Sequence, residues 1–280
     1  MCAALIKIAH SAHVQIRVAG RAFVSAGQRN QPCIFMAFPA NHKYSVSFFR
    51  IFYYNEDMFT QNKCLVHHCQ HNALSAFDED GNITEEKNYC LDHIPNPGMV
   101  KENICKYIHE HEKIIGLNAC GIFFSDMDFS NKKFFGCDFT GCSFMNVRAD
   151  NITARLCFFD FSSFTDCSFT NSSIIFTSFS ASTFAHSLLT SSNLIQCNFN
   201  AIQAYQSSFD GTDLFSSRFI KSLLFDTSFR NCNLKKTILY DTKRMNVSFK
   251  MSNTREAVFS RSGDNSDDAQ FGNSIVDGGA

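Results

Sequence analysis

The chain has 280 residues, of which 45% are hydrophobic, and its 25 basic and 26 acidic side chains give a formal net charge of −1. This length and apolar content can bury a core without covalent staples, which excludes disorder as the main state of the chain. The near balance of charge excludes a strongly basic nucleic-acid binder and a strongly acidic mimic of nucleic acid. The unusual counts are 32 Phe, 13 Cys and no Trp.

The first 55 residues contain no acidic side chain; the first is Glu56. This leader lacks the long apolar run of a secretory signal, and the sequence nowhere reaches the ~18 uninterrupted apolar residues of a membrane span. It is compatible with an uncleaved export segment, a short strand-rich domain or an extension that does not fold. Because there is no secretory signal, we expect reduced thiols and synthesis in a cytoplasm.

Residues 1–98 form a non-repeat region that is rich in Cys and His. The pairs Cys64-x₂-His67 and Cys90-x₂-His93 have the composition of a tetrahedral zinc site. Alternate ligands in the same stretch are His68, Cys69 and His71. Buried thiols and surface imidazoles are the competing interpretation, since close pairs arise by chance in such a segment.

A strong helix breaker at residues 95–98, PNPG, precedes a helical pattern from Met99 to Leu117. The apolar side of this pattern comprises Val100, Ile104, Ile108, Ile114, Ile115 and Leu117. A solenoid leaves the end of its core open unless another element covers it. We therefore predict that residues 99–118 form a helix that caps the repeat region.

From Phe124 to Leu239 every fifth residue is apolar, without an insertion or a deletion. The series has 24 positions, of which 14 are Phe, and chance would produce such a run with a probability on the order of 10⁻⁸. The residue two places before each apolar centre is small: of the 17 positions from Cys157 to Thr237, all but Ile202 are Ser, Thr or Cys. The residue two places after it is often Asn, Asp or Gly, which are turn formers.

A spacing of five fits neither the 3.6-residue period of a helix nor the 2.0-residue period of a strand. In this spacing the sequence resembles the pentapeptide-repeat family, whose unit is usually written A-(D/N)-L-x-x. The stretches that carry the resemblance are CDFTG, CSFMN, CSFTN, CNFNA, TDLFS, TSFRN and CNLKK. The resemblance implies an all-β solenoid over residues 119–260, a right-handed quadrilateral β-helix with about 20 residues per coil and six or seven coils.

In such a coil, residues 20 apart stack on one another, so the rings of one face should form a ladder in the core. The ladder members are Phe139, Phe159, Phe179, Phe199 and Phe219. Six Cys fall in the small inward column, where we expect them to act as small buried hydrophobic residues. They are Cys137, Cys142, Cys157, Cys167, Cys197 and Cys232.

Residues 121–260 carry 11 acidic and 13 basic side chains, a net charge of +2. Pentapeptide rods that protect type II topoisomerases imitate the negative charge of DNA, and this positive balance disfavours that function here. Basic residues gather toward the last coils, where Arg230 should stack near Lys250 and Lys235 near Arg255. This patch is a candidate partner-binding site or a solvated surface.

No catalytic motif is present, so we predict that the chain is not an enzyme and that it has no cofactor apart from a possible zinc ion. The chain also resembles type III secreted effectors of enteric bacteria, which join a non-repeat segment to a rod. This resemblance implies a protein-interaction scaffold in the bacterial cytoplasm or secreted into a host cell. The alternatives are a topoisomerase-binding DNA mimic and a zinc-binding amino-terminal module with the rod as spacer. Residues 261–280 are polar, and we predict that they are disordered.

Overall fold

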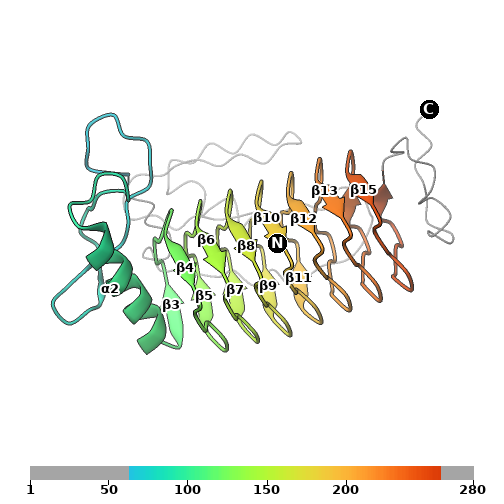
Figure 1. Cartoon of the computed structure of the whole chain (residues 1–280), viewed down its shortest axis with the longest axis horizontal. Helices are drawn as coiled ribbons and strands as arrows, with labels where there is room; N and C mark the ends of the chain where they lie inside the picture. The colour runs from blue at the N-terminus through green and yellow to red at the C-terminus, as the bar shows by residue number, and fades with distance from the viewer. Residues whose placement is uncertain (1–62, 260–280) are drawn as a thin grey trace, which may run out of the picture. The chain divides into compact units, whose positions relative to one another are not determined.

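The computed structural model describes residues 63–259. The described residues all belong to one compact unit. That unit starts with a short antiparallel pair and a helix, which are followed by a stack of short strands (Figure 1). The elements are β1 (Ala76–Phe77), β2 (Ile83–Thr84), α2 (Pro97–Glu110), β3 (Lys113–Ile115), β4 (Phe123–Ser125), β5 (Lys133–Phe135), β6 (Ser143–Met145), β7 (Thr153–Arg155), β8 (Ser163–Thr165), β9 (Ser173–Ile175), β10 (Thr183–Ala185), β11 (Asn193–Ile195), β12 (Gln203–Tyr205), β13 (Leu223–Phe225), β14 (Ile238–Leu239), β15 (Lys243–Met245) and β16 (Val258–Phe259).

The stacked strands pair in parallel, and each residue pairs with the one 20 positions later in the chain. Strands β4, β6, β8, β10, β12, β13 and β15 form a seven-stranded sheet in which Phe164 pairs with Phe184. Strands β3, β5, β7, β9 and β11 form a five-stranded sheet in which Ile114 pairs with Phe134. The β14–β16 pair and single bridges such as Ser168–Leu188 connect the coils on the other faces. The predicted β-solenoid of about seven 20-residue coils is confirmed.

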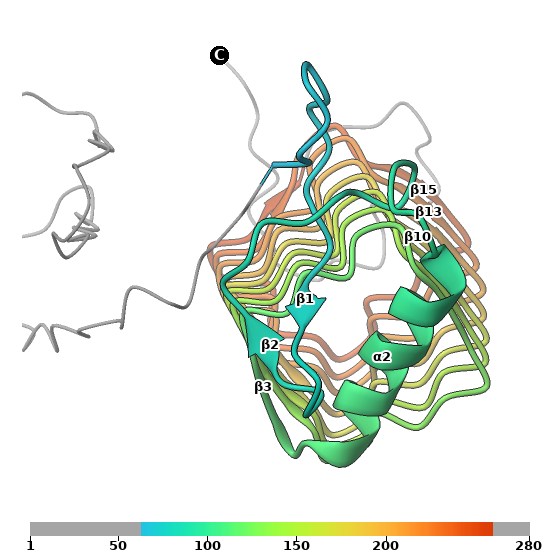
Figure 2. The same cartoon turned by 90° about the vertical axis from the view of Figure 1, so that its left-hand side faces the viewer.

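Viewed along its axis, the solenoid is a stack of similar coils with flat sides and sharp corners (Figure 2). The corner residues lie two places after each apolar centre and adopt left-handed backbone angles, such as φ 65° at Asn131, 69° at Gly141 and 55° at Asn171. Asn, Asp and Gly tolerate this region of backbone space better than other residues do. The column of turn formers in the sequence therefore marks the corners, as predicted.

Stacked phenylalanine rings fill the core. Ring centroids in the predicted ladder are 5.0 Å apart between Phe139 and Phe159, and again between Phe159 and Phe179. The next two spacings, to Phe199 and then Phe219, are 5.1 Å and 4.8 Å, and neighbouring planes differ by 10° or less. These are offset-stacked geometries that add to the burial of apolar area. The five predicted core residues are all buried.

The small inward column has a second role, because its hydroxyls connect successive coils. Ser182 Oγ donates to the Phe159 carbonyl at 2.6 Å and accepts from the Ser162 N–H at 3.1 Å. The Cys142 thiol makes the equivalent contact with the Ala119 carbonyl at 3.0 Å. Buried backbone groups need such partners. This requirement explains why the column holds Ser, Thr and Cys and seldom Ala.

The helix is shorter than the sequence predicted. Helix α2 begins after Asn96, whose side chain accepts from the Met99 N–H at 3.2 Å, and it ends before His111, whose backbone is extended. The prediction that it continues to residue 118 is wrong, because β3 begins at Lys113 and Ile114 lies in the core of the first coil. Ile114 fits the spacing of a helix, but it also fits the five-residue frame. The rod thus begins two repeats before Phe124 and not at residue 119.

Helix α2 covers the amino-terminal end of the core, as predicted. Its buried residues Val100, Ile104 and Ile108 belong to the same apolar cluster as Ile114 and Phe124 of the first coils. Figure 2 shows α2 lying across one part of this end and the β1–β2 pair across another. The open edge of the first coil is therefore protected from pairing with another chain.

The segment before the helix, residues 63–96, packs onto the first coils. Leu74 is buried in the shared core, and Phe77, Ile83, Leu91 and Ile94 are partly buried against it. The backbones of Ser75 and Asn118 are joined by a 2.9 Å hydrogen bond, and the Asn118 N–H also donates to Ser75 Oγ at 2.9 Å. Asn72 donates to Asp138 Oδ2 at 2.8 Å. Apart from β1 and β2, this segment has no regular strand or helix before α2 begins.

At the last coil, Arg244 interrupts the apolar frame. It lies in β15, pairs with Leu224 of β13 and is only 8% exposed. Its guanidinium carbon is 5.5 Å from the centre of the Phe259 ring, a cation–π geometry that offsets part of the cost of burying a charge. A buried cation thus lies among the apolar residues of the last described coil, such as Phe249 and Phe259.

Two predicted regions, the leader of residues 1–55 and the disordered tail of residues 261–280, lie outside the described residues. Within residues 63–259, no helix has the length and apolar content that crossing a bilayer requires.

Candidate functional site

Three thiols and one imidazole converge in the segment that precedes the helix. Cys64 and Cys69 lie in the loop before β1, while Cys90 and His93 lie between β2 and α2. Cys69 Sγ is 3.8 Å from Cys90 Sγ, and His93 Nδ1 is 3.5 Å from Cys64 Sγ and 3.2 Å from Cys90 Sγ. All four potential ligand atoms lie within 4.8 Å of one another. We refer to these four residues as the Cys₃His cluster.

The cluster contains three of the four zinc ligands predicted from the sequence: Cys64, Cys90 and His93. The fourth, His67, is exposed and lies outside the cluster, and Cys69 takes its place. A tight turn explains the exchange, because the Cys69 N–H donates to the Val66 carbonyl at 3.0 Å and brings Cys69 back toward Cys90.

The surroundings of the cluster shift the pKa values of two of its thiols in opposite directions. Burial by itself would raise the pKa of Cys64, but hydrogen bonds from the backbone N–H groups of Cys90 and Val66, with the His93 ring, lower it to about 6. Burial and the neighbouring sulfurs of Cys64 and Cys69 raise the pKa of Cys90 to about 11. A Cys64 thiolate therefore forms easily, and a bound cation would stabilise the other thiolates.

A second potential ligand group consists of His71, Cys90 and Asp92, so it shares Cys90 with the Cys₃His cluster. The His71 Nδ1 atom is 3.0 Å from Asp92 Oδ2, and both side chains are about two-thirds exposed. The exposed His71–Asp92 pair joins two loops and is the alternate ligand set to that of Cys64, Cys69 and His93.

The cysteines of the rod are unlike Cys64. Burial raises the pKa of Cys197 to about 12 and that of Cys232 to about 11, and burial also raises the pKa of Cys142 and Cys167. A thiol of this kind is a poor nucleophile, because the thiolate is the reactive form. These residues fill the core, as the sequence predicted.

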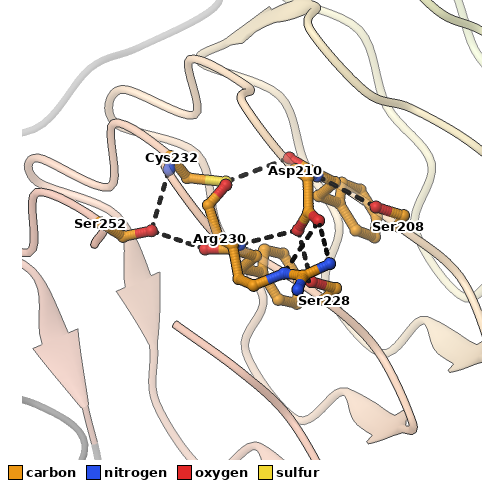
Figure 3. A network of polar contacts seen from close by, with 8 residues as sticks. Ser208, Asp210, Ser228, Arg230, Cys232 and Ser252 are labelled. Carbon is orange, nitrogen blue, oxygen red and sulfur yellow. Dashed lines mark hydrogen bonds and ion pairs between the residues drawn. The ribbon is translucent and has the colours of Figure 1, made fainter. Parts of the chain in front are cut away.

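Of the four predicted partner-binding cations, Arg230 is engaged within the rod (Figure 3). Its guanidinium donates to Asp210 Oδ2 through Nη2 at 2.9 Å and through Nε at 3.1 Å. The Arg230 N–H donates to Asp210 Oδ1 at 2.8 Å, and the Ser228 hydroxyl donates to the same oxygen. Asp210 thus offsets the charge of Arg230 and fixes its side chain.

The other predicted cations lie on the last two coils. Lys235 and Arg255 both approach the Glu256 carboxylate, at 3.8 Å and 3.4 Å, and Lys236 approaches it at 3.7 Å. Lys250 is exposed. One carboxylate therefore faces three cations, and this end of the rod keeps a positive charge.

The sequence analysis missed five large apolar side chains that lie on the middle coils, at or beside two adjacent corners. We call this group the aromatic face, and its members are Leu156, Phe158, Phe161, Ile175 and Phe176. Phe161 is 71% exposed and Phe176 is 53% exposed, while the other three are half-buried. Leu156, Phe158 and Phe161 follow one another along one coil, and the Leu156 N–H donates to the Ile175 carbonyl of the next coil at 3.3 Å. The signal in the sequence was the large apolar side chain at a corner position.

Three members of the aromatic face occupy left-handed corners. The φ angles are 55° at Leu156, 58° at Phe161 and 54° at Phe176. Large side chains are uncommon in this region of backbone space, and they cost about 1–2 kcal/mol each relative to an ordinary conformation. The three residues are thus strained, and two of them are mostly exposed.

No family model matches this sequence, and no curated protein matches it. The structure is similar to solved β-solenoids. One is the pentapeptide repeat protein Rfr23 from the cyanobacterium Cyanothece 51142, with 12% identity, 56% of this chain and 98% of that chain covered, and a TM-score of 0.30.

A second solved structure is HetL from Nostoc sp. strain PCC 7120, a pentapeptide repeat protein involved in heterocyst differentiation regulation. The match has 12% identity and a TM-score of 0.24, and it covers 56% of this chain and 93% of that chain. A third is QnrB1, a plasmid-mediated fluoroquinolone resistance protein. The match has 16% identity and a TM-score of 0.23, and it covers 49% of this chain and 86% of that chain. Two of the three bear the name of the family that the sequence resembles. Because these scores are low, the fold is assigned from the 20-residue register of this chain itself.

Proposed function

We propose that this chain is a non-enzymatic scaffold whose rod binds a protein partner through the aromatic face. The observation that carries the proposal is the exposure of Phe161 and Phe176 at left-handed corners. Most other corners hold smaller or more polar residues, such as Asn131, Gly141 and Asp166, which fit these angles or remain in contact with water.

Two physical arguments support a protein as the partner. Neither exposed ring packs into the core, so the folded chain gains little from them and bears the backbone strain. Aromatic side chains are enriched at the centres of protein interfaces, where burial of a large rigid surface contributes most of the binding energy. Arg155, exposed in β7 next to Leu156, would add a contact for a carboxylate of the partner.

The remaining chemistry of the rod supports binding and not catalysis. Burial raises the pKa of Cys142, Cys167, Cys197 and Cys232. His186, the one histidine of the repeat region, lies between Asp166 Oδ1 at 3.3 Å and Gln206 Oε1 at 2.8 Å. Both contacts join residues 20 apart on neighbouring coils, which is how the rod also connects Asp213 to Asn233. Such contacts stabilise the stack and leave no nucleophile beside the imidazole.

The alternative of a topoisomerase-binding DNA mimic has weaker support. The net charge of the repeat region is +2, and its carboxylates are matched with donors one coil later. Examples are Asp126 with Asn146 at 2.7 Å, Asp226 with Asn246 at 2.9 Å, and Asp210 with Arg230. A supercoiling assay with purified gyrase tests the alternative, and inhibition at micromolar protein would favour it over the scaffold.

We also propose a second, electrostatic contact with the same partner. It would be made by the predicted cations Lys235, Lys250 and Arg255. Synthesis in a bacterial cytoplasm and export into a host cell belong to the proposal too; the first rests on the sequence features and the resemblance given above, and the second also on the acid-free leader of residues 1–55. Secretion of the full chain, compared with a chain that lacks residues 1–55, tests the export. Unchanged export without the leader would contradict it.

The partner is tested by affinity capture with the full chain and two variants. The double variant Phe161→Asn/Phe176→Asn removes both rings and relieves the corner strain, and Ser191→Asn is the matched control at an exposed corner with φ 55°. We expect a protein that binds the wild type and the control, and that binds the double variant at least about tenfold more weakly, since each hot-spot ring is worth more than about 1 kcal/mol. Equal capture by all three would contradict the proposal.

A further inference from the structure

We infer that Cys64, Cys69, Cys90 and His93 bind one zinc ion through three sulfurs and the Nδ1 nitrogen. In a tetrahedral site with Zn–S near 2.3 Å and Zn–N near 2.0 Å, two sulfurs are about 3.8 Å apart and a sulfur and a nitrogen about 3.5 Å apart. The Cys69–Cys90 separation of 3.8 Å and the Cys64–His93 separation of 3.5 Å match these values. The Cys90–His93 separation of 3.2 Å is slightly shorter.

The donor set selects the metal and the type of site. Thiolates and imidazole in a tetrahedron favour Zn²⁺ over Mg²⁺ or Ca²⁺, which take oxygen ligands. Because the protein supplies all four ligands, no position stays open for water or substrate, and the site is structural. A disulfide does not explain the cluster, since the Cys69–Cys90 distance is almost twice the ~2.05 Å of a sulfur–sulfur bond.

Backbone hydrogen bonds hold the ligand loops in place. The Cys64 N–H donates to the His71 carbonyl at 3.0 Å, and the Cys69 N–H donates to the Val66 carbonyl at 3.0 Å, so the loop that carries Cys64 and Cys69 folds back on itself. Cys90 also turns directly into His93, whose N–H donates to the Cys90 carbonyl at 3.0 Å. These short turns hold both ligand pairs before a metal arrives, which lowers the entropy cost of binding it.

The zinc ion would fasten the segment of residues 63–96 over the end of the rod. It joins the loop before β1 to the loop before α2, and both loops carry contacts to the first coils. Leu91, one residue after Cys90, packs so closely on Gly121 that a methyl group there would lie 3.2 Å from Leu91 Cδ2. Asn72, three residues after Cys69, binds Asp138. The segment has only two very short strands, and the ion would add to the apolar packing of residues such as Leu74 and Ile83 on the core.

Metal content of the full chain tests the site. Protein purified under reducing conditions without chelator should contain about one zinc per chain by elemental mass spectrometry, and so should the control His67→Ala and the variant His71→Ala, which removes a member of the alternate ligand set. Cys69→Ser and Cys90→Ser should lose most of it. Replacement by Co²⁺ should give the sulfur-to-cobalt charge-transfer bands and the intense visible bands of a tetrahedral thiolate site.

Three results would overturn the inference. The first is wild-type protein with no bound zinc and no cobalt spectrum after reconstitution with either metal. The second is a Cys69–Cys90 disulfide in the wild type, detected by mass. The third is equal loss of zinc in His67→Ala and Cys69→Ser, which would refute the ligand set.

Reversible removal of the metal from the wild type tests the structural role without relying on variants that fold poorly. Chelation should make bonds within residues 63–96 sensitive to limited proteolysis, and added zinc should restore their resistance. Unchanged cleavage after complete removal would contradict the structural role. Neither experiment depends on the aromatic face, so failure here leaves the proposed function standing.

Discussion

The rod and the segment that covers its end are stabilised in opposite ways. From Lys113 to Phe259 a five-residue rule repeats with few interruptions such as Arg244, and neighbouring coils are joined repeatedly by ring stacking and by hydroxyl-to-carbonyl bonds. Residues 63–96, which we call the cover, contain no repeat. They hold two strands of two residues each and the Cys₃His cluster. We therefore expect stability to be distributed along the rod, and to depend in the cover on the Cys₃His cluster.

This contrast predicts different responses to damage. In a solenoid each coil contacts only its neighbours, so one substitution is felt locally and in proportion to what it removes. In the cover, loss of a single ligand removes the main connection between its two loops. Four substitutions in the rod test the first of these responses, from the largest expected change in stability to the smallest.

The largest effect should come from a ring at the centre of the ladder. Phe179 is 1% exposed and stacks between Phe159 and Phe199 at 5.0 Å and 5.1 Å. Phe179→Ala should lower the free energy of unfolding by about 3–5 kcal/mol in denaturant titrations, because the cavity cannot close between fixed coils. Ser180→Ala, one residue away and half-buried, should cost far less. Equal losses would show that the inward register is wrong.

A smaller effect should follow the loss of one inter-coil hydroxyl. Ser182→Ala removes the donor to the Phe159 carbonyl and the acceptor of the Ser162 N–H, and leaves both buried groups without that partner. We expect a loss of about 1–2 kcal/mol by thermal or chemical melting. Ser173→Ala, at a half-buried outward position of β9, should change stability by less than about 0.5 kcal/mol. No difference between the two would mean that the column is selected for size alone.

The Asp210 network should contribute stability only above acid pH. Although burial opposes it, the hydrogen bonds from Ser228 and Arg230 lower the pKa of Asp210. A carboxylate with a lowered folded-state pKa stabilises the fold above its unfolded pKa of about 3.9 and loses that effect as the pH falls through the folded value.

Asp210→Asn should therefore destabilise the chain by about 1 kcal/mol at pH 7. Melting curves of the variant and the wild type should converge as the pH is lowered below about 4. Glu86→Gln, at an exposed site of the cover, is the control. A difference that is constant from pH 7 to pH 3 would exclude the carboxylate charge as its cause.

The smallest expected change is an increase in the free energy of unfolding. Phe176→Asn replaces an exposed ring at φ 54° with a residue that tolerates this angle, and we expect unfolding free energy to rise by about 0.5–1 kcal/mol. Differential scanning calorimetry can resolve the shift. A loss of more than about 1 kcal/mol would mean that the ring packs against the rod and is not free for a partner.

The rod was predictable because its rule is local and repeats. The five-residue frame, the small column and the turn column each identify the same coil, and the strand register confirms it. The start of the rod was missed for a physical reason. Ile104, Ile108 and Ile114 fit one face of a helix, whereas Ile114 and Ala119 also continue the five-residue frame, and the sequence alone does not decide between the two. The extended backbone at His111 decides it.

The cluster and the aromatic face were less predictable. Residues 64–71 contain five potential ligands in eight positions, and the turn from Val66 to Cys69 determines which of them face inward. The sequence analysis chose His67 because Cys64-x₂-His67 repeats the spacing of Cys90-x₂-His93, and it kept His68, Cys69 and His71 as alternates. Phe161 and Phe176 stood in the turn column from the start, but exposure and backbone angle are tertiary properties that reveal them as unusual.

Hydrogen exchange on the full chain, with and without a zinc chelator, tests the contrast between rod and cover most directly. With metal bound, we expect protected amides both in residues 63–96 and in the strands from β4 to β15. After chelation, protection should fall by about tenfold or more in residues 63–96 and stay unchanged in those strands. Loss of protection throughout the rod, or none in residues 63–96, would contradict the account.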